Sequence, residues 1–334
     1  MKNIARLTTE KSALETYLKG QGWLLLNESL NAVEIPGAGN MNLTLRIKTR
    51  ERSFIIKQSR DYVEKYPQVP APEKRALREA EFYELIALED SLSSMMPVLN
   101  GVDRINNVLN LEDLGDSRDY SFLYEEGVSL SLEDLKEIIA FISQLHTTVN
   151  TATTQATLAN VEMRKLNHEH IYNYPYLDDN GLNLDSVLMG LAEIAAPYKN
   201  DAVLKAELQK LGNRYLANGT TLLHGDYFPG SWLKTKAGIK IIDPEFCFFG
   251  DPEFEMGVTL AHLKMAAQPE ALIDSAIDLY TEKGSLDRQL CFKYMAAEIL
   301  RRILGLAQLP LTLTLAKRKE LLEESRSILV RSNH

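Results

Sequence analysis

The chain has 334 residues, of which 45% are hydrophobic and 25% are charged, and its formal net charge is -9. This length exceeds what one hydrophobic core usually supports, so we expect two domains. The negative charge disfavours nucleic acid and anionic membrane surfaces as partners. Two cysteines are too few for a disulfide framework. No apolar run is long enough to cross a bilayer and no signal peptide is recognisable, so we expect a cytoplasmic protein.

The first third of the chain reads mainly as β structure. A short helix over 9–18 ends before Gly20, and strands follow over 32–35, 43–47 and 53–57. The first two strands are separated by a glycine-containing turn. A loop rich in proline and tyrosine is expected over 62–72, an amphipathic helix over 73–88, and a last strand over 108–114.

Beyond Gly115 the pattern becomes mainly helical. Ser131, with Asp134 three residues later, is a good N-cap for a helix that reaches His146. Strands are expected here only beside the two polar clusters described below. The sequence therefore predicts an α+β protein, with a mostly β domain over 1–114 and a mostly helical domain over 115–334. The remaining helices are expected over 186–196, 203–216, 270–283, 287–306 and 315–330.

The first polar cluster is His224-Gly225-Asp226, which follows an apolar run, with Ser231 five residues after Asp226. In phosphoryl transfer, an aspartate in such a loop accepts the proton of the attacking hydroxyl. A polar residue five positions later reaches a metal ion or steadies the loop. The alternative is that His224 and Asp226 only cap a turn.

The second cluster is Asp243-Pro244-Glu245, flanked by isoleucine and phenylalanine residues. In an extended segment, Asp243 and Glu245 would point to the same side. Two carboxylates on one side suit Mg2+, which prefers oxygen ligands. The apolar neighbours argue against an ordinary exposed turn, because acids among core residues need a compensating partner.

Lys57 ends an apolar strand, where a lysine is costly unless it is paired or holds phosphate. Glu79 on the following helix is the expected ion-pair partner, with Glu81 as the second candidate. The turn that contains Gly37 and Gly39 lies between two strands upstream of Lys57, which fits a loop that covers ATP phosphates.

Arg301 and Arg302 lie in a mostly apolar helix. Adjacent residues on a helix point about 100° apart. We therefore expect one arginine to reach a ligand anion and the other to pair with a carboxylate such as Glu298. Arginine suits bidentate binding of phosphate.

These segments resemble the kinase-like superfamily of aminoglycoside phosphotransferases and choline kinases, and within it the 5-methylthioribose kinase family. Ser231, where most of the superfamily has asparagine, the Asp-Pro-Glu segment and the twin arginines make the resemblance specific. It implies a bilobal protein-kinase-like fold, with a small antiparallel sheet and one long helix followed by a larger helical lobe. The segments that carry the resemblance are 37–43, 55–58, 75–81, 111–114, 224–231, 243–246 and 301–305.

The resemblance also implies roles for individual residues, with ATP and Mg2+ as cofactors. Asp226 would be the base for a sugar hydroxyl, with Ser231 in the same loop. Arg301 and Arg302 would steady the γ-phosphate and the substrate. Homodimerisation is expected from the resemblance alone, and segment 62–72 lacks the tryptophan that the family has there. The residues assigned to nucleotide and metal are Gly37, Gly39, Asn40, Lys57, Glu79, Glu112 and Leu114 for ATP, and Asp243 and Glu245 for Mg2+.

The resulting hypothesis is an ATP- and Mg2+-dependent kinase for a small hydroxylated substrate, with 5-methylthioribose first. An alternative is a kinase for an aminoglycoside, a choline-like alcohol or a fructosamine. A cationic acceptor calls for an acidic cluster, and Asp178-Asp179 is the obvious candidate. A third hypothesis is a kinase fold that binds nucleotide without catalysis. The presence of Lys57, Asp226 and Asp243 counts against it.

Overall fold

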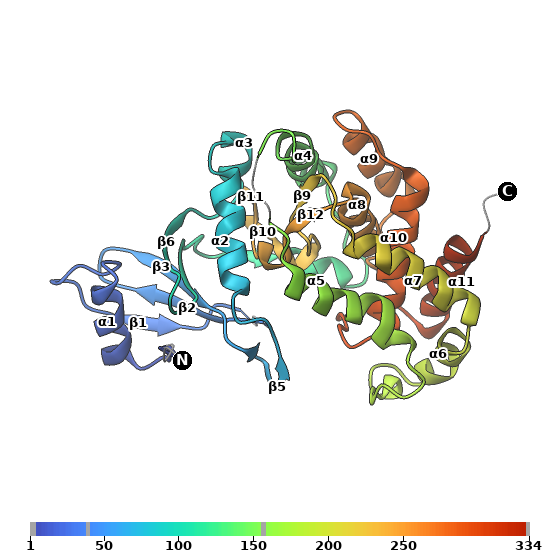
Figure 1. The fold of residues 1–334 in the computed structure, drawn as a ribbon, viewed down its shortest axis with the longest axis horizontal. Helices are drawn as coiled ribbons and strands as arrows, with labels where there is room; N and C mark the ends of the chain where they lie inside the picture. Colours follow the sequence, from blue (N-terminus) through green and yellow to red (C-terminus); the bar gives the residue numbers. More distant parts are fainter. Residues whose placement is uncertain (1–4, 38–40, 155–157, 332–334) are drawn as a thin grey trace. The chain divides into compact units, whose positions relative to one another are not determined.

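The computed structural model describes residues 5–37, 41–154 and 158–331 (Figure 1). The chain divides into two compact units, and each contains two segments of the sequence. Unit 1 is Met1–Ser117 with Thr235–Phe246, and unit 2 is Arg118–Lys234 with Cys247–His334. The first break lies close to the expected boundary near Gly115. Segment Thr235–Phe246, which we expected with the C-terminal domain, groups instead with unit 1.

Unit 1 contains a five-stranded antiparallel sheet in the order β1-β2-β3-β7-β6. The alternating burial of β2 explains its formation, because every second side chain faces the core. The predicted loop over 62–72 is instead a short hairpin of β4 (Tyr62–Val63) and β5 (Tyr66–Pro70). The sheet strands are β1 (Ala32–Glu34), β2 (Leu43–Lys48), β3 (Ser53–Gln58), β6 (Leu99–Asp103) and β7 (Val108–Glu112).

In the described residues of unit 1, the sheet is accompanied by the helices α1 (Lys11–Gly20), α2 (Arg75–Ile86) and α3 (Asp90–Ser93). Helix α2 packs against β6, β7 and a 3-10 turn, η6 (Pro244–Phe246). The turn follows β11 (Gly238–Ile241). Packing against α2 therefore explains why this late segment belongs to unit 1. The core beneath the sheet includes Leu14, Leu18, Leu45, Ile47 and Ile56.

Unit 2 is mainly helical, as predicted, and Ser131 caps α4 by accepting a hydrogen bond from the Asp134 amide at 3.0 Å. Helices α8 and α10 lie side by side (Figure 1). They pack closely at Gly257, where an added Cβ would lie 2.6 Å from the Cys291 carbonyl oxygen. The helices are α4 (Leu132–Thr148), α5 (Val161–His168), α6 (Leu191–Lys199), α7 (Ala202–Leu216), α8 (Pro252–Met265), α9 (Glu270–Thr281), α10 (Arg288–Leu304) and α11 (Leu315–Val330).

Four short strands of unit 2 lie beside its catalytic-loop candidate. β9 (Thr221–Leu223) pairs with β12 (Phe248–Gly250), and β10 (Trp232–Thr235) pairs with β8 (Arg118–Asp119). As the sequence predicted, β9 and β10 flank the first polar cluster, and β11 and β12 flank the second. Strand β8 lies beside neither cluster in the sequence and was not predicted. Together the two units confirm the α+β class.

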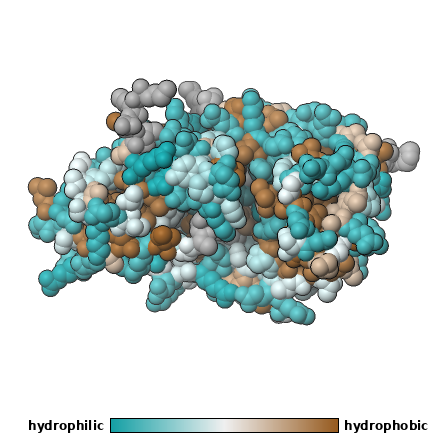
Figure 2. All heavy atoms as spheres, turned by 90° about the horizontal axis from the view of Figure 1, so that it is seen from below, coloured by the Kyte–Doolittle hydropathy of each residue, from teal (hydrophilic) through white to brown (hydrophobic). Residues whose placement is uncertain are grey.

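No helix in the described part of the chain is both long and apolar enough to cross a membrane. Large hydrophobic side chains that are strongly exposed include Leu26, Leu88 and Met189. On the face drawn in Figure 2, hydrophobic residues lie among hydrophilic ones. Single exposed hydrophobic residues of this kind are normal on protein surfaces.

Candidate functional site

Lys57 lies near the end of β3, and its ammonium group contacts two carboxylates within unit 1. Its Nζ atom lies 2.6 Å from Glu79 Oε2 on α2 and 2.5 Å from Asp243 Oδ1. The side chains of Lys57 and Glu79 are buried, whereas about half of the Asp243 side chain is exposed (51%). The predicted pair with Glu79 is therefore confirmed. Glu81, the second candidate, pairs with Arg78.

The backbone at Asp243 differs from the extended segment that we expected. Asp243 has a left-handed conformation, with φ of 64°, and the next three residues form the η6 turn. Aspartate is one of the few residues that tolerate this conformation, and such strained positions cluster at functional sites. Asp243 and Glu245 therefore do not lie on one side of an extended strand, and that prediction was wrong. Both carboxylates still act electrostatically on Lys57. The η6 turn, which contains Glu245, packs against α2, the helix that contains Glu79.

Glu245 is buried, and two further side chains of unit 1 contact its carboxylate. Asn42 Nδ2 donates a hydrogen bond to Glu245 Oε2 at 2.7 Å, and Arg75 Nε lies 3.5 Å from the same oxygen. Arg75 also donates to four backbone carbonyls, those of Met41, Arg60, Tyr62 and Pro72. Sequence reasoning missed Asn42 and Arg75 as site residues. One usable signal was the cation in the first turn of α2, where the helix dipole disfavours positive charge.

Three carboxyl groups, those of Glu79, Asp243 and Glu245, accompany the two cations Lys57 and Arg75 in this cluster. Burial raises the pKa of Glu79 to about 8, with Asp243 and Glu245 adding to the effect, although Lys57 opposes it. Burial disfavours the charge of Lys57, but Asp243, Glu79 and Glu245 outweigh it and hold its pKa above the ordinary value. The cluster has more carboxyl groups than cations, and the Asp243 carboxylate is partly exposed, so these oxygens are suited to bind a divalent cation.

A metal ion at this cluster would need oxygen ligands from elsewhere. Within the described residues, no group of three or more His, Cys, Asp or Glu side chains is arranged to hold a metal. Mg2+ commonly binds proteins through one or two carboxylates and completes its shell with water and phosphate oxygens. Asp243 and Glu245 are thus suited to a metal that arrives with a phosphate ligand.

Of the other residues that we assigned to ATP binding, the structure describes Gly37, Glu112 and Leu114. Gly37 has φ of 66°, which fits the tight turn predicted there, whereas Gly39 and Asn40 lie outside the described residues. Glu112 ends β7, and its carboxylate accepts a hydrogen bond from the Val98 amide at 3.1 Å. Leu114 lies partly buried just beyond it. Their contact with adenine stays a prediction.

In unit 2, the loop after β9 holds Asp226 in a defined geometry. Gly225 has φ of 86°, a conformation that favours glycine. The Asp226 amide donates to His224 Nδ1 at 3.4 Å, and Ser231 Oγ donates to the Asp226 carbonyl oxygen at 2.7 Å. Ser231 therefore steadies the loop, which was one of its two expected roles.

Glu255 on α8 holds the loop that contains Asp226 by binding its backbone amides. Its carboxylate accepts hydrogen bonds from the amides of His224, at 3.2 Å, and Gly225, at 2.8 Å, and contacts His146 Nε2 at 2.9 Å. Burial disfavours the charge of Glu255, but His146 and these bonds hold its pKa below the ordinary value. Sequence reasoning missed Glu255 because it missed α8. The Asp251-Pro252 start of that helix was an available signal.

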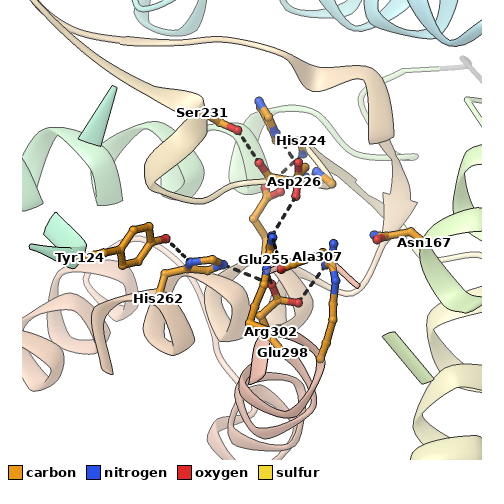
Figure 3. Close-up of polar contacts among 12 residues, drawn as sticks. Tyr124, Asn167, His224, Asp226, Ser231, Glu255, His262, Glu298, Arg302 and Ala307 are labelled. Carbon is orange, nitrogen blue, oxygen red and sulfur yellow. Dashed lines mark hydrogen bonds and ion pairs between the residues drawn. The ribbon is translucent and has the colours of Figure 1, made fainter. Parts of the chain in front are cut away.

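Both arginines of α10 bind one carboxylate. Arg301 Nη1 lies 3.0 Å from Glu298 Oε2, and Arg302 Nε lies 2.6 Å from Glu298 Oε1. The predicted pairing with Glu298 therefore occurs for both arginines, and the contact of one of them with a ligand anion stays a prediction. Arg302 Nη2 also lies 3.8 Å from Asp226 Oδ1. Figure 3 shows the Arg302 side chain extending toward the loop that contains Asp226.

The structure thus assembles the predicted residues in two groups, each within one unit. Unit 1 brings Lys57, Glu79, Asp243 and Glu245 together. Unit 2 brings Asp226, Ser231 and Arg302 together, with Arg301 joined through Glu298. A carboxylate beside a guanidinium, on a loop held by buried hydrogen bonds, is an arrangement that can accept a proton from a hydroxyl near bound phosphate.

Residues 32–287 match the family described as the phosphotransferase enzyme family, APH. That span is well over half of the chain. The chain belongs to this family. The predicted kinship with aminoglycoside phosphotransferases and choline kinases is confirmed.

Among curated relatives, the chain is similar to proteins named methylthioribose kinase. It is 26% identical to that of Exiguobacterium sibiricum over 269 residues, which is 74% of this chain and 64% of the relative. It is 27% identical to that of Cronobacter sakazakii over 259 residues, which is 74% of this chain and 63% of the relative. The match therefore spans less than two thirds of the length of these relatives.

Solved structures of the same fold support the architecture. The choline kinase LicA from Streptococcus pneumoniae matches with a TM-score of 0.54 at 12% identity, over 96% of this chain and 99% of that one. Spectinomycin phosphotransferase, solved with ADP and spectinomycin, matches with a TM-score of 0.53 at 14% identity, over 95% and 97% of the two chains. These likenesses show that the predicted kinase-like α+β fold is correct.

Proposed function

We propose that this protein is an ATP- and Mg2+-dependent kinase that phosphorylates a hydroxyl of a small neutral sugar, with 5-methylthioribose as the first candidate. The observation that carries the proposal is the placement of Asp226. Its loop is held by Glu255 and Ser231, and Arg302 lies 3.8 Å from its carboxylate. A fixed carboxylate beside a buried arginine suits proton acceptance next to a phosphoryl group.

In the proposed reaction, the unit 1 cluster serves the nucleotide. Lys57 is held by Glu79 and would bind phosphate oxygens, and Asp243 and Glu245 would bind Mg2+. Bound Mg2+ neutralises charge on the phosphates. Asn42 and Arg75 orient the Glu245 carboxylate, so they position a metal ligand without needing to touch the nucleotide.

The unit 2 residues would serve the acceptor. Asp226 would accept the proton of the attacking hydroxyl, and its loop geometry limits the directions from which that hydroxyl can approach. Arg302 and Arg301 carry fixed positive charge that can offset the charge of the transferred group. Because Glu298 holds both guanidinium groups, little reorganisation is needed when a phosphoryl group arrives.

The charges in unit 2 favour a neutral acceptor over a cationic one. Arg301 and Arg302 are buried cations on the acceptor side, and they would repel an ammonium group. The acidic candidate for a cationic acceptor, Asp178-Asp179, behaves as a solvated loop. Asp178 is 77% exposed and 3.6 Å from Lys205, and Asp179 accepts a bond from the Gly181 amide. The methylthioribose kinases among the relatives support the same choice.

The proposal is tested by measuring ADP release with Mg2+ and ATP against a panel of acceptors. The panel contains 5-methylthioribose, ribose, choline, a fructosamine and two aminoglycosides, and the Asp226→Asn variant gives the background rate. We expect the highest turnover with 5-methylthioribose. Turnover with choline or an aminoglycoside but with neither sugar would overturn the choice of a neutral acceptor. No turnover with any member, despite nucleotide binding, would favour the non-catalytic hypothesis.

Replacing Ser231 with alanine tests whether this residue steadies the loop or binds metal. The change removes one hydrogen bond, worth about 1 kcal/mol, so we expect kcat to fall by less than about tenfold. The Mg2+ concentration for half-maximal activity should stay the same. Ser186→Ala removes a similar hydroxyl-to-carbonyl bond in an exposed turn and serves as the control. A clearly increased Mg2+ requirement in Ser231→Ala alone would identify Ser231 as a metal ligand.

A further inference from the structure

A line of contacting polar side chains in unit 2 leads from Tyr124 to Asp226 (Figure 3). Tyr124 Oη lies 2.5 Å from His262 Nδ1, and His262 Nε2 lies 3.2 Å from Glu298 Oε1. The same Glu298 oxygen accepts the bond from Arg302 Nε at 2.6 Å. Arg302 then reaches Asp226. The first four members of this line are buried, so water does not compete for their hydrogen bonds.

The chemistry of the partners fixes where the protons lie. An ionised glutamate only accepts hydrogen bonds, so His262 must donate from Nε2. His262 Nδ1 is then the acceptor, and the Tyr124 hydroxyl donates to it. The electrostatics agree with this assignment. Burial, reinforced by Arg302, lowers the pKa of His262 to about 4 although Glu298 opposes the shift, so the imidazole is neutral at pH 7.

The bond from His262 restricts how the Glu298 carboxylate can turn. Oε1 is shared by His262 and Arg302, whereas Oε2 binds Arg301. With this orientation, Arg302 uses Nε for Glu298 and directs Nη2 toward Asp226. Phe228, two residues after Asp226, packs on the Arg302 guanidinium and on the His262 ring. The centroid of the Phe228 ring lies 4.9 Å from Arg302 Cζ and 5.1 Å from the centroid of the His262 ring.

We infer that His262 is a positioning residue for phosphoryl transfer, which acts through Glu298 to keep Arg302 directed at Asp226. Tyr124 supports it by donating a hydrogen bond to Nδ1, which holds the imidazole ring with Nε2 directed at Glu298. The inference rests on the proposed function for its catalytic consequence, whereas the hydrogen-bond arrangement stands independently. Partners that orient the ligands of a metal site commonly change activity by about 10–100-fold when they are lost, and we expect an effect of similar size for a partner that orients Arg302.

The first test determines which ring nitrogen of His262 carries the proton, and it needs no sugar or other phosphoryl acceptor. The protein is labelled with 15N-histidine, and the resonances of the ring nitrogens are recorded by long-range 1H–15N correlation at pH 7. The chain has six histidines, and the His262→Gln variant identifies the resonance that disappears. We expect a neutral ring with its proton on Nε2. A proton on Nδ1, or a cationic ring at pH 7, would overturn the inference whatever the acceptor proves to be.

The second test compares His262→Leu with His262→Gln, using the panel acceptor that gives the highest turnover. Glutamine can place an N–H group near the position of Nε2, and leucine cannot. We expect His262→Leu to lower kcat by about tenfold or more, with the nucleotide Kd within about twofold of the wild-type value. His262→Gln should restore most of kcat. Equal losses in both variants, unchanged kcat in both, or a parallel fall in nucleotide affinity would contradict a positioning role.

A matched control is available at His168, whose Nε2 has no hydrogen-bond partner among the described residues. His168→Leu should leave kcat within about twofold of the wild-type value, because its ring donates nothing to the Glu298 pair. If no panel member is phosphorylated, the proposed function fails, and the NMR result still decides whether His262 holds Glu298 as inferred.

Discussion

Replacing Asp226 with asparagine is expected to lower kcat by about 10²–10⁴-fold, while nucleotide affinity stays within about twofold. Asparagine has nearly the same shape, but its neutral amide cannot accept the proton of the attacking hydroxyl. The loop should persist, because it is held through the Asp226 backbone by Ser231 and by the amides that bind Glu255. ADP release with the best panel acceptor measures kcat, and calorimetric titration with ADP measures nucleotide affinity.

Asp178→Asn is the matched control, because Asp178 is exposed and its contact with Lys205 is long, at 3.6 Å. We expect this control to keep wild-type turnover with a neutral sugar. It also addresses the cationic alternative, since loss of turnover with a cationic acceptor would give Asp178 a binding role. Wild-type turnover in Asp226→Asn would remove the assignment of Asp226 as the base.

Replacing Glu298 with glutamine should have the largest effect on stability, lowering the free energy of unfolding by about 3–5 kcal/mol. The change leaves Arg301 and Arg302 buried without their common counter-charge. Although burial disfavours the charged form, the two arginines hold the pKa of Glu298 below its unfolded value. Its contribution to stability is therefore present above the unfolded pKa and is lost as the pH falls below it. Urea unfolding at pH 7 and at lower pH measures both effects.

The control for this variant is Glu320→Gln on α11, where Glu320 pairs with Lys317 at 2.9 Å on an exposed surface. Exposed pairs contribute little, so we expect a change within about 1 kcal/mol. Equal effects of the two substitutions would show that Glu298 does not compensate buried charge. A loss confined to Glu298→Gln would instead agree with the pairing in the structure.

Features encoded in short stretches of sequence were predicted well. The three strands that lead to Lys57, the cap at Ser131 and helix α11 each follow from local periodicity or capping. The Lys57–Glu79 pair was also predicted, because a buried lysine requires a counter-charge and a nearby helix offered one. Helix α8 was missed because it is buried on nearly all sides, so it lacks the polar face that reveals an amphipathic helix.

By itself, the sequence determined which residue types carry the chemistry and the order in which they occur, since these depend on neighbours along the chain. Tertiary structure alone decided how those residues are held. It set the left-handed backbone of Asp243, placed Thr235–Phe246 in unit 1 and joined both arginines to Glu298. His262 and Glu255 find their partners across long sequence separations. Their burial requires such partners, but local patterns cannot say which ones packing will supply.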